Sequence, residues 1–261
     1  MLDRRQKYLQ IALNSTLEEA RAIISQIPLD KRIIIEAGTP LIKTYGLGAI
    51  QMIRTWWEER ILGPLQTQTS KYSNIWEILL SDIFKLPVKS SSTSKSPTSA
   101  NVFVPYIVAD LKSMDRGERE VKIAKEGGAN AAVVLGQAPI ETINAFIEEC
   151  EKVGLDSMID MMNVEYPLEV LRKLKTLPTV VILHRGVDEE IFNPESEIPY
   201  HEIQRIKSNY DILVAVAGGD TIQEVQRAIF NDADIVVVWK SFYQSTAQTA
   251  KLAEDFLREI K

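Results

Sequence analysis

The chain contains few of the residues that carry thiol and imidazole chemistry. Its 261 residues include one cysteine, Cys150, and two histidines. One cysteine cannot form an internal disulfide, so the sequence excludes a disulfide-bonded scaffold. A lone cysteine suits a reducing compartment, and we therefore expect a cytoplasmic location.

Long apolar runs and an excess of positive charge are also missing. No apolar run approaches the roughly 18 residues that a membrane-spanning helix needs. The basic N-terminal residues have no apolar stretch behind them, so we expect no secretory signal. The net charge of −6 argues against a general nucleic-acid-binding protein. The 45% hydrophobic and 25% charged residues are typical of a globular protein and exclude disordered, collagen-like and coiled-coil chains.

Short apolar runs alternate with amphipathic stretches along the chain. Eight runs are rich in Val, Ile or Leu at both odd and even positions, as in parallel strands covered on both faces. The expected strands are Tyr8–Leu13, Arg32–Ala37, Val102–Ala109, Ala131–Leu135, Ser157–Met161, Thr179–His184, Asp211–Val216 and Asp234–Val238. The expected helices include Leu17–Ile27, Arg116–Glu126, Ile140–Val153, Pro167–Lys175, Ile222–Phe230 and Thr246–Ile260. Thr16, Asp115 and Asp220-Thr221 precede three of these helices as capping residues.

Eight strands that each precede a helix predict a (β/α)8 TIM barrel, formed by residues 1–261 as one domain. An open, doubly wound α/β sheet is the alternative. It is disfavoured because no Gly-x-Gly-x-x-Gly turn follows the first strand. A short extra segment, Glu189–Pro199, follows the sixth strand, where barrel loops carry function.

A long insertion, residues 55–100, precedes the third strand. Its first part contains Trp56, Trp57 and Trp76, and its second part, Lys89–Ala100, is rich in Ser, Thr, Lys and Pro. A polar tract of this kind cannot bury enough apolar surface to become ordered, so we expect a disordered tip. The insertion is either a tolerated addition, or a lid or oligomer contact built on the tryptophans.

A cluster of charge ends the third strand, in Val-Ala-Asp110-Leu-Lys112-Ser-Met-Asp115. Residues two apart in a strand point the same way, so Asp110 and Lys112 would face the barrel mouth together. Active sites of TIM barrels lie at this carboxyl end. Buried charges must be paired, so the cluster either carries function or is an ion pair that closes the barrel end.

Polar residues end other strands too. Glu36 ends the second strand, and carboxylates that converge with Asp110 without cysteine partners favour a hard cation such as Mg²⁺. His184 ends the sixth strand, where it is either an acid/base group or a structural residue. Gly218-Gly219 follows the seventh strand, where backbone amides would form an anion site of the kind that holds phosphate in barrels.

Several motifs, in the same order and at matching strand ends, together resemble those of 3-hexulose-6-phosphate synthase. That enzyme belongs to the orotidine-monophosphate decarboxylase group, which shares the Asp-x-Lys-x-x-Asp signature. The resemblance covers the chain outside residues 55–100 and 189–199. The motifs are Glu36-Ala-Gly-Thr-Pro-Leu-Ile, Ala-Asp110-Leu-Lys112-Ser-Met-Asp115-Arg-Gly-Glu, Val-Val-Leu-Gly136, Met-Ile-Asp160-Met, His184-Arg-Gly-Val-Asp188 and Val-Ala-Gly218-Gly219.

The resemblance implies a Mg²⁺-dependent aldolase. In the synthase, ribulose 5-phosphate loses a C1 proton, and the enediolate attacks formaldehyde to give a 3-hexulose 6-phosphate; the reverse cleavage is equally implied. The expected partners are thus a sugar phosphate and formaldehyde. The resemblance also implies a homodimer of barrels with shared active sites.

Roles follow from the resemblance position by position. Glu36 and Asp110 would hold or flank the metal. Lys112 would donate to the enediolate oxygen, where negative charge develops. Asp115 would reach into the partner subunit's site, and His184 would move the proton.

The substrate-binding positions include two departures from the family pattern. Asp160, Gly218 and Gly219 match it, and the glycines would offer amides to the phosphate. The first strand ends at Asn14, where the family has aspartate. After the eighth strand, Trp239-Lys240 replaces a Gly-Gly or Gly-Arg pair, although the Lys240 cation remains available to a phosphate.

Three functional readings remain open from the sequence. The first is the synthase reaction. The second is another enzyme of the group with an altered substrate. The third is a non-catalytic homologue that binds a metabolite or a partner. The ketogulonate-phosphate decarboxylase branch is disfavoured, because that branch has an arginine where this chain has Val187.

Overall fold

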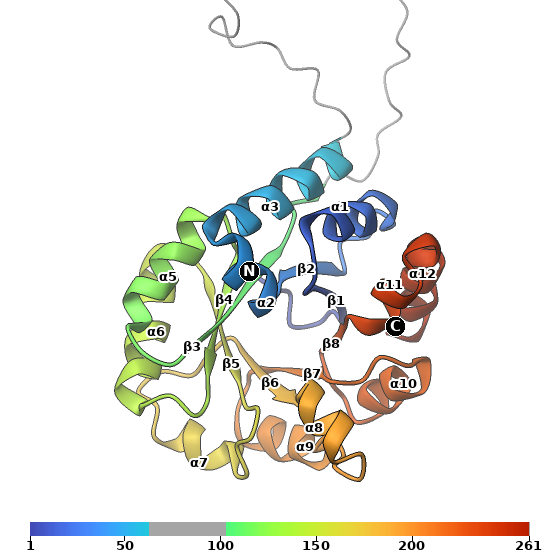
Figure 1. The fold of residues 1–261 in the computed structure, drawn as a ribbon. Helices are drawn as coiled ribbons and strands as arrows, with labels where there is room; N and C mark the ends of the chain where they lie inside the picture. Colours follow the sequence, from blue (N-terminus) through green and yellow to red (C-terminus); the bar gives the residue numbers. More distant parts are fainter. Residues whose placement is uncertain (63–102, 261) are drawn as a thin grey trace, which may run out of the picture.

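The computed structural model describes residues 1–62 and 103–260, which form a closed barrel of eight parallel strands ringed by helices (Figure 1). Neighbouring strands pair in chain order, and β8 closes the barrel against β1. The predicted TIM barrel is therefore confirmed. The strands are β1 (Tyr8–Leu13), β2 (Ile33–Ala37), β3 (Ile107–Ser113), β4 (Ala131–Leu135), β5 (Asp156–Asp160), β6 (Val180–His184), β7 (Leu213–Ala217) and β8 (Ile235–Val238).

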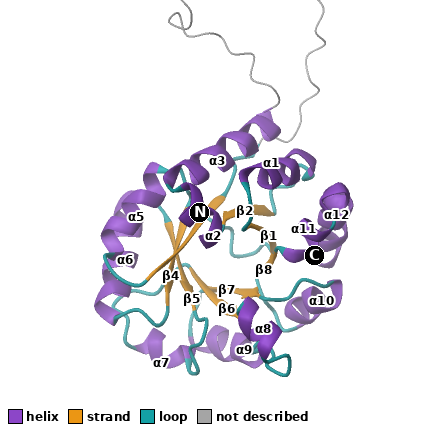
Figure 2. Ribbon diagram, in the orientation of Figure 1, coloured by secondary structure: helices purple, strands orange, loops and turns teal. Residues whose placement is uncertain are grey.

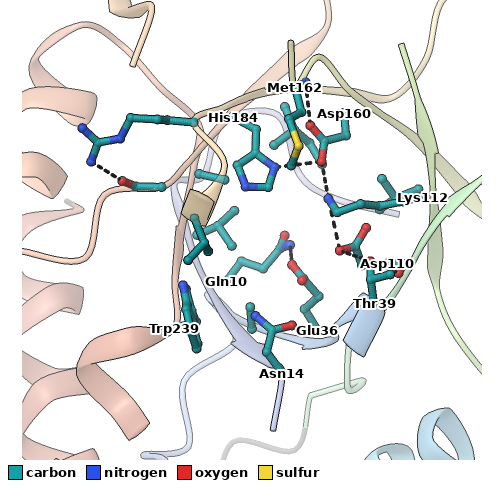
Figure 3. Close-up of a pocket in the computed structure, with 18 of the residues that line it drawn as sticks. Gln10, Asn14, Glu36, Thr39, Asp110, Lys112, Asp160, Met162, His184 and Trp239 are labelled. Atoms are coloured by element: carbon teal, nitrogen blue, oxygen red, sulfur yellow. Dashed lines mark hydrogen bonds and ion pairs between the residues drawn. The ribbon is translucent and has the colours of Figure 1, made fainter. Parts of the chain in front are cut away.

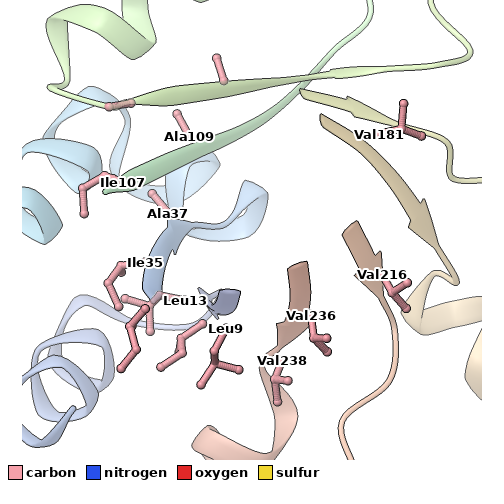
Figure 4. Packing of buried hydrophobic residues seen from close by; sticks show 14 of the residues in the cluster. Leu9, Leu13, Ile35, Ala37, Ile107, Ala109, Val181, Val216, Val236 and Val238 are labelled. Carbon is pink, nitrogen blue, oxygen red and sulfur yellow. The ribbon is translucent and has the colours of Figure 1, made fainter. Parts of the chain in front are cut away.

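Alternation along each strand separates two apolar layers. Leu9, Ile11 and Leu13 of β1 face outward and pack in a cluster between the strands and the helices (Figure 4). Tyr8 and Ala12 belong to a second cluster inside the barrel. Because side chains in a strand alternate between faces, every second residue of each strand faces the barrel axis. The inward positions at the carboxyl ends of the strands are the ones that build the pocket described below.

The helices form the outer layer (Figure 2). Among the described residues, no helix combines the length and the apolar character needed to cross a membrane. The predicted helices are present, except that the expected helix Thr246–Ile260 begins with a 3₁₀ turn, Thr246–Gln248, and the expected helix Pro167–Lys175 ends at Arg172. The helices are α1 (Leu17–Gln26), α2 (Thr39–Tyr45), α3 (Leu47–Leu62), α5 (Gly117–Glu126), α6 (Ile140–Val153), α7 (Pro167–Arg172), α8 (Val187–Phe192), α9 (Tyr200–Asn209), α10 (Ile222–Phe230), α11 (Lys240–Gln244) and α12 (Thr249–Glu259).

Helix caps agree with the sequence in two of three places. Thr16 and Thr221 each cap their helix in a reciprocal box with a glutamate three residues later. The sequence predicted Asp115 as the cap of α5, but the structure shows that it does not cap this helix. Arg116 holds the N-cap position instead, with φ of 55°, and its side chain makes no capping hydrogen bond. The chain must turn sharply between β3 and α5, which places Asp115 one residue too early to cap.

The start of the expected insertion belongs to the barrel. Residues 55–62 are the last turns of α3, and Trp57 is fully buried there, with its ring edge-on to Phe103 at 6.1 Å. Trp56 is partly buried against the same core. Residues 63–100, which include Trp76 and the Ser/Thr-rich tract, lie outside the described residues.

Candidate active site

The carboxyl ends of the strands open into a pocket of about 410 Å³ (Figure 3). Its base is apolar and includes Val133, Ile182 and Val237, which are inward-facing residues of three strands. Seven of the ten predicted site residues line it: Asn14, Glu36, Asp110, Lys112, Asp160, His184 and Gly218. Strands far apart in the sequence thus bring most of the candidate residues together.

Asp110 and Lys112 both reach the pocket from β3, as the spacing predicted. The strand is irregular there, because its pairing with β4 shifts register between Ala109 and Ser113. Lys112 lies in the left-handed region with φ of 46°, a conformation that costs a non-glycine residue on the order of 1 kcal/mol. Its Nζ lies 3.3 Å from Asp110 Oδ2. The irregular backbone aims the ammonium across the barrel, toward β5.

Asp160 is the residue on which the polar network converges. Its Oδ2 accepts from Lys112 Nζ at 2.5 Å and lies 2.8 Å from His184 Nδ1, while Oδ1 accepts from the Met162 amide at 2.9 Å. The carboxylate is only 1% exposed. Burial alone would raise the pKa of Asp160, but the opposing effects of His184 and Lys112 hold it well below its usual range.

Asp110 and Asp160 act in turn on Lys112. Desolvation would lower the pKa of Lys112, but the two carboxylates outweigh it and raise that pKa well above the usual range. Lys112 is therefore an ammonium at neutral pH. The result is a polar chain, Asp110–Lys112–Asp160–His184, that runs across β3, β5 and β6, with the ammonium between two carboxylates and the imidazole at its end (Figure 3).

The His184 ring is oriented by Asp160. An Nδ1–H that donates to the Asp160 carboxylate leaves the lone pair on Nε2. Figure 3 shows the ring directed into the pocket. An imidazole held in this way by a buried carboxylate is suited to take and return a proton.

One carboxylate oxygen of Asp110 is hydrogen-bonded and the other is not. Thr39, the first residue of α2, donates its hydroxyl to Asp110 Oδ2 at 2.8 Å and to the Asp110 carbonyl at 2.7 Å. The second carboxylate oxygen, Oδ1, is buried and has no hydrogen-bond partner among the described residues. A buried anionic oxygen without a donor is costly, so the site is incomplete without a further group.

Glu36 is the second carboxylate at this end of the pocket. Gln10, an inward residue of β1, donates Nε2 to Glu36 Oε2. Burial and the nearby Asp110 charge raise the pKa of Glu36 to about 8. A neighbouring cation would favour the ionised form.

Asp110 Oδ1, which has no hydrogen-bond donor among the described residues, and the adjacent Glu36 carboxylate together fit a divalent cation. Within residues 1–62 and 103–260, no group of three or more Asp, Glu, His or Cys side chains is arranged around a common metal position. Two carboxylates nevertheless suit Mg²⁺, which is often bound by one or two carboxylates together with water and substrate oxygens. The chemistry of the donors therefore agrees with the predicted metal ligands.

We expect Glu36→Gln to stabilise the metal-free protein at alkaline pH. Because folding raises the pKa of Glu36 from 4.5 to about 8, its contribution to stability is fully present below about pH 4.5 and is lost as the pH rises through 8. The neutral glutamine avoids that loss, with an expected gain on the order of 4 kcal/mol at pH 8 and little gain at pH 5. Urea unfolding at both pH values in a chelator measures it. Glu59→Gln, at an exposed position of α3, is the matched control, and equal stability of wild type and E36Q at pH 8 would contradict the expectation.

The loop after β7 is tightly tied to that after β6. Gly218 has φ of 95°, and a Cβ there would lie 2.3 Å from the Arg185 carbonyl oxygen, so only glycine fits. The Arg185 guanidinium donates to the carbonyls of Gly218 at 2.8 Å and Ser196 at 3.1 Å. Arg185 thus fixes the backbone at the position predicted to meet the phosphate.

Three predicted residues lie outside the pocket lining. Asp115 borders a surface groove at the start of α5, and its role toward a partner subunit stays a prediction. Gly219 packs behind Gly218, close to Glu224. Lys240 Nζ pairs with Glu190, which does line the pocket.

The two departures from the family pattern lie on the same side of the mouth. The Asn14 side-chain oxygen occupies the space that a side chain at Gly38 would fill. The backbone N–H of Asn14 also donates to the Tyr243 hydroxyl at 2.8 Å. The Tyr243 ring lies edge-on to the Trp239 indole at 6.0 Å. Trp239, which directly follows β8, lines the pocket (Figure 3).

Among the lining residues that received no role from the sequence, three polar ones stand out: Gln10, Thr39 and Glu190. Gln10 gave a signal, since it is the one polar residue within the apolar run Tyr8–Leu13. Thr39 follows Gly38 at the start of a helix that the pattern did not predict. No feature of the sequence distinguished Glu190 from its neighbours in the extra segment Glu189–Pro199.

Comparisons with known proteins agree on one group. The family model described as Orotidine 5'-phosphate decarboxylase / HUMPS family matches residues 100–254. The bifunctional enzyme Fae/Hps of Methanothrix thermoacetophila is 34% identical over 256 residues, which is 97% of this chain and 53% of that protein. The namesake from Methanocella arvoryzae is 37% identical over 238 residues, or 90% of this chain and 48% of that protein. This chain spans about half the length of both.

A solved structure shares the fold. The crystal structure of 3-hexulose-6-phosphate synthase from Salmonella typhimurium superposes with a TM-score of 0.70, covering 97% of this chain and 98% of that one. The sequence identity is 22%, so this likeness bears on the fold alone.

Proposed function

The chain belongs to the orotidine 5'-phosphate decarboxylase / HUMPS family, and from this we propose that it catalyses the aldol condensation of formaldehyde with ribulose 5-phosphate, or the reverse cleavage. The Fae/Hps relatives, similar over nearly the whole of this chain, support the choice within the family. The observation that carries the proposal is the polar chain Asp110–Lys112–Asp160–His184 in the pocket.

His184 is proposed to remove the C1 proton of ribulose 5-phosphate. Its Nε2 lone pair faces the pocket when Nδ1–H donates to Asp160, and the Asp160 carboxylate stabilises the imidazolium that forms. The same imidazolium returns the proton when the reaction runs backward. Asp160 therefore orients the base and balances its charge.

Lys112 is proposed to stabilise the negative charge that develops on the enediolate oxygen. Its ammonium is held by Asp110 and Asp160 before substrate arrives, so it costs little reorganisation when the charge forms. The C1 carbon of the enediolate then attacks the formaldehyde carbon as the C2 oxygen returns to a carbonyl. The formaldehyde oxygen becomes a hydroxyl by taking the proton held by the His184 imidazolium, which restores the neutral base. The new C–C bond gives a 3-hexulose 6-phosphate.

We propose Mg²⁺ as the cation of the site, with Asp110 and Glu36 as its protein ligands. The buried, unpartnered Oδ1 of Asp110 supports this assignment. When bound, the cation would act as a Lewis acid on substrate oxygens. Thr39 and Gln10 would keep the two carboxylates in place through the hydrogen bonds described above.

The substrate-binding residues and the oligomeric state are proposed from the family. Gly218, Gly219 and Lys240 would bind the phosphate, and Asn14 the sugar. The exposed position of Asp115, away from the pocket of its own chain, supports a homodimer in which this residue reaches the partner's site. We also retain a cytoplasmic location as a prediction.

Proton exchange tests the proposed function most directly. Ribulose 5-phosphate in D₂O with the protein and Mg²⁺ should lose a C1 proton signal in ¹H NMR spectra, and a chelator should suppress this loss. Adding formaldehyde should then yield the hexulose phosphate. No exchange with either Mg²⁺ or Mn²⁺ would contradict the proposal.

A further inference from the structure

Acidic side chains outnumber basic ones where the loops after β6, β7 and β8 meet. The polar contacts that join these loops involve three carboxylates, of Asp220, Glu190 and Glu224, and two cations, Arg185 and Lys240. A phosphate dianion would have to bind beside this excess of negative charge. At least one acid must therefore give up its contact, or its position, when such a ligand enters.

Two of the three acids are firmly held. Asp220 Oδ1 accepts from the backbone amides of Trp239 at 2.7 Å and Lys240 at 2.9 Å. Glu224 Oε2 accepts from the amides of Asp220 at 3.0 Å and Thr221 at 3.1 Å in the cap of α10. Both carboxylates satisfy backbone donors that would otherwise be left without partners, so moving either is costly.

Glu190 is held far less firmly. Among the described residues, its carboxylate has one ion-pair partner, Lys240 Nζ. It stands on α8, a helix of six residues, none of which is buried. The side chains of the pair are 21% exposed for Lys240 and 32% exposed for Glu190. Of the three acids, Glu190 can leave its place at the lowest cost.

Lys240 is poised between the pair and the pocket. Its Nζ meets Glu190 on one side and lies 5.9 Å from the centre of the Trp239 ring on the other, and both of these residues line the pocket. The lysine side chain is a flexible four-carbon stem with a mobile point charge. A rotation of that stem is enough to exchange one anionic partner for another.

We propose that Glu190 determines specificity by acting as a displaceable counter-ion of Lys240. When a phosphate monoester binds, Lys240 releases the Glu190 carboxylate and pairs with the phosphate oxygens, while Glu190 moves outward with α8. A dianion competes well against a single carboxylate for the ammonium, whereas an uncharged sugar leaves the pair closed. The inference depends on the proposed function in that the ligand is a sugar phosphate.

Binding measurements on four variants test this exchange. Isothermal titration calorimetry with ribulose 5-phosphate at pH 8, without formaldehyde, gives the dissociation constant of the whole chain. Glu190→Gln should bind roughly fivefold more tightly than wild type, since a competing charge is lost. Lys240→Met should bind about tenfold more weakly. In the E190Q/K240M double variant, the gain from E190Q should vanish, because the two residues act as one unit.

The matched control is Glu189→Gln on the same helix. Glu189 accepts a hydrogen bond from the Ser196 hydroxyl and does not pair with Lys240. The affinity of the E189Q variant for ribulose 5-phosphate should therefore equal that of wild type. Inorganic phosphate as a second probe should show the same ranking, and thermal melts of each variant report that it is folded.

Three results would overturn the inference: E190Q binding no more tightly than wild type, K240M binding equally well, or the E190Q gain persisting without Lys240. The binding readout is independent of turnover. If E190Q binds ribulose 5-phosphate more tightly but the protein catalyses no C1 exchange, the proposed function is refuted and the role of Glu190 as counter-ion stands. If the protein catalyses C1 exchange but E190Q binds no more tightly than wild type, the proposed function stands and the counter-ion role is refuted.

Discussion

Replacing Lys112 with alanine is expected to lower kcat/KM for ribulose 5-phosphate by about a thousandfold, the effect of removing a preorganised charge from a developing oxyanion. The ammonium lies 2.5 Å from Asp160 and 3.3 Å from Asp110, so no other described cation replaces it in this network. Steady-state kinetics and C1 proton exchange measure the loss. An active K112A enzyme would end the assignment of Lys112 as a catalytic residue.

The control for this experiment is Lys122→Ala. Lys122 is a half-exposed lysine of α5 that lies 3.6 Å from Glu149, away from the pocket. Its removal should leave kcat/KM unchanged. K112A leaves two buried carboxylates without their cation, so its thermal stability must be measured alongside activity.

Asp160→Asn is expected to have the second largest effect, on both activity and stability. Asparagine keeps the shape but loses the charge that orients His184 and pairs with Lys112. We expect kcat to fall at least about a hundredfold. Breaking a buried pair by neutralising one partner should cost about 3 kcal/mol of stability. Steady-state kinetics and urea unfolding measure the two effects.

The pH dependence of that stability loss follows from the lowered pKa of Asp160. Because folding lowers this pKa below 3.8, the contribution of the carboxylate is present above that pH and is lost only as the pH falls toward the folded value. The stability difference between wild type and D160N should therefore shrink as the pH falls below 3.8.

Asp156→Asn is the control for Asp160→Asn on the same strand. Asp156 begins β5 at the opposite end of the barrel, where it accepts from the Tyr106 hydroxyl at 2.6 Å. Its replacement should lower stability and leave kcat unchanged, because the amino-terminal face of a barrel serves stability rather than catalysis. D160N with wild-type kcat would refute the role given to Asp160.

Strand periodicity made the barrel and most of the pocket predictable. Glu36, Asp110, Asp160 and His184 share the parity of the apolar residues that fill the barrel, and each lies in the carboxyl-terminal part of its strand. Any residue in such a position must face the mouth of a closed barrel.

What the sequence did not reveal depends on contacts between distant residues. The left-handed Lys112 arises from a register shift between β3 and β4, which a single strand's pattern cannot encode. Glu190 and Lys240 are 50 residues apart and meet only because the loops of a barrel converge. Helix α3 was partly assigned to an insertion, because the connection before the third strand is far longer than is usual in a barrel and its tryptophans resembled an added element.

The two carboxylates around Lys112 also have a consequence for chemical selectivity. Formaldehyde reacts readily with unprotonated amines, and a lysine in a pocket that binds it is at risk of being consumed. Asp110 and Asp160 raise the pKa of Lys112, so its nitrogen carries a proton in place of a nucleophilic lone pair. In the proposed reaction, formaldehyde is thereby left to the sugar carbon, and the residue that stabilises the nucleophile is protected from competing with it.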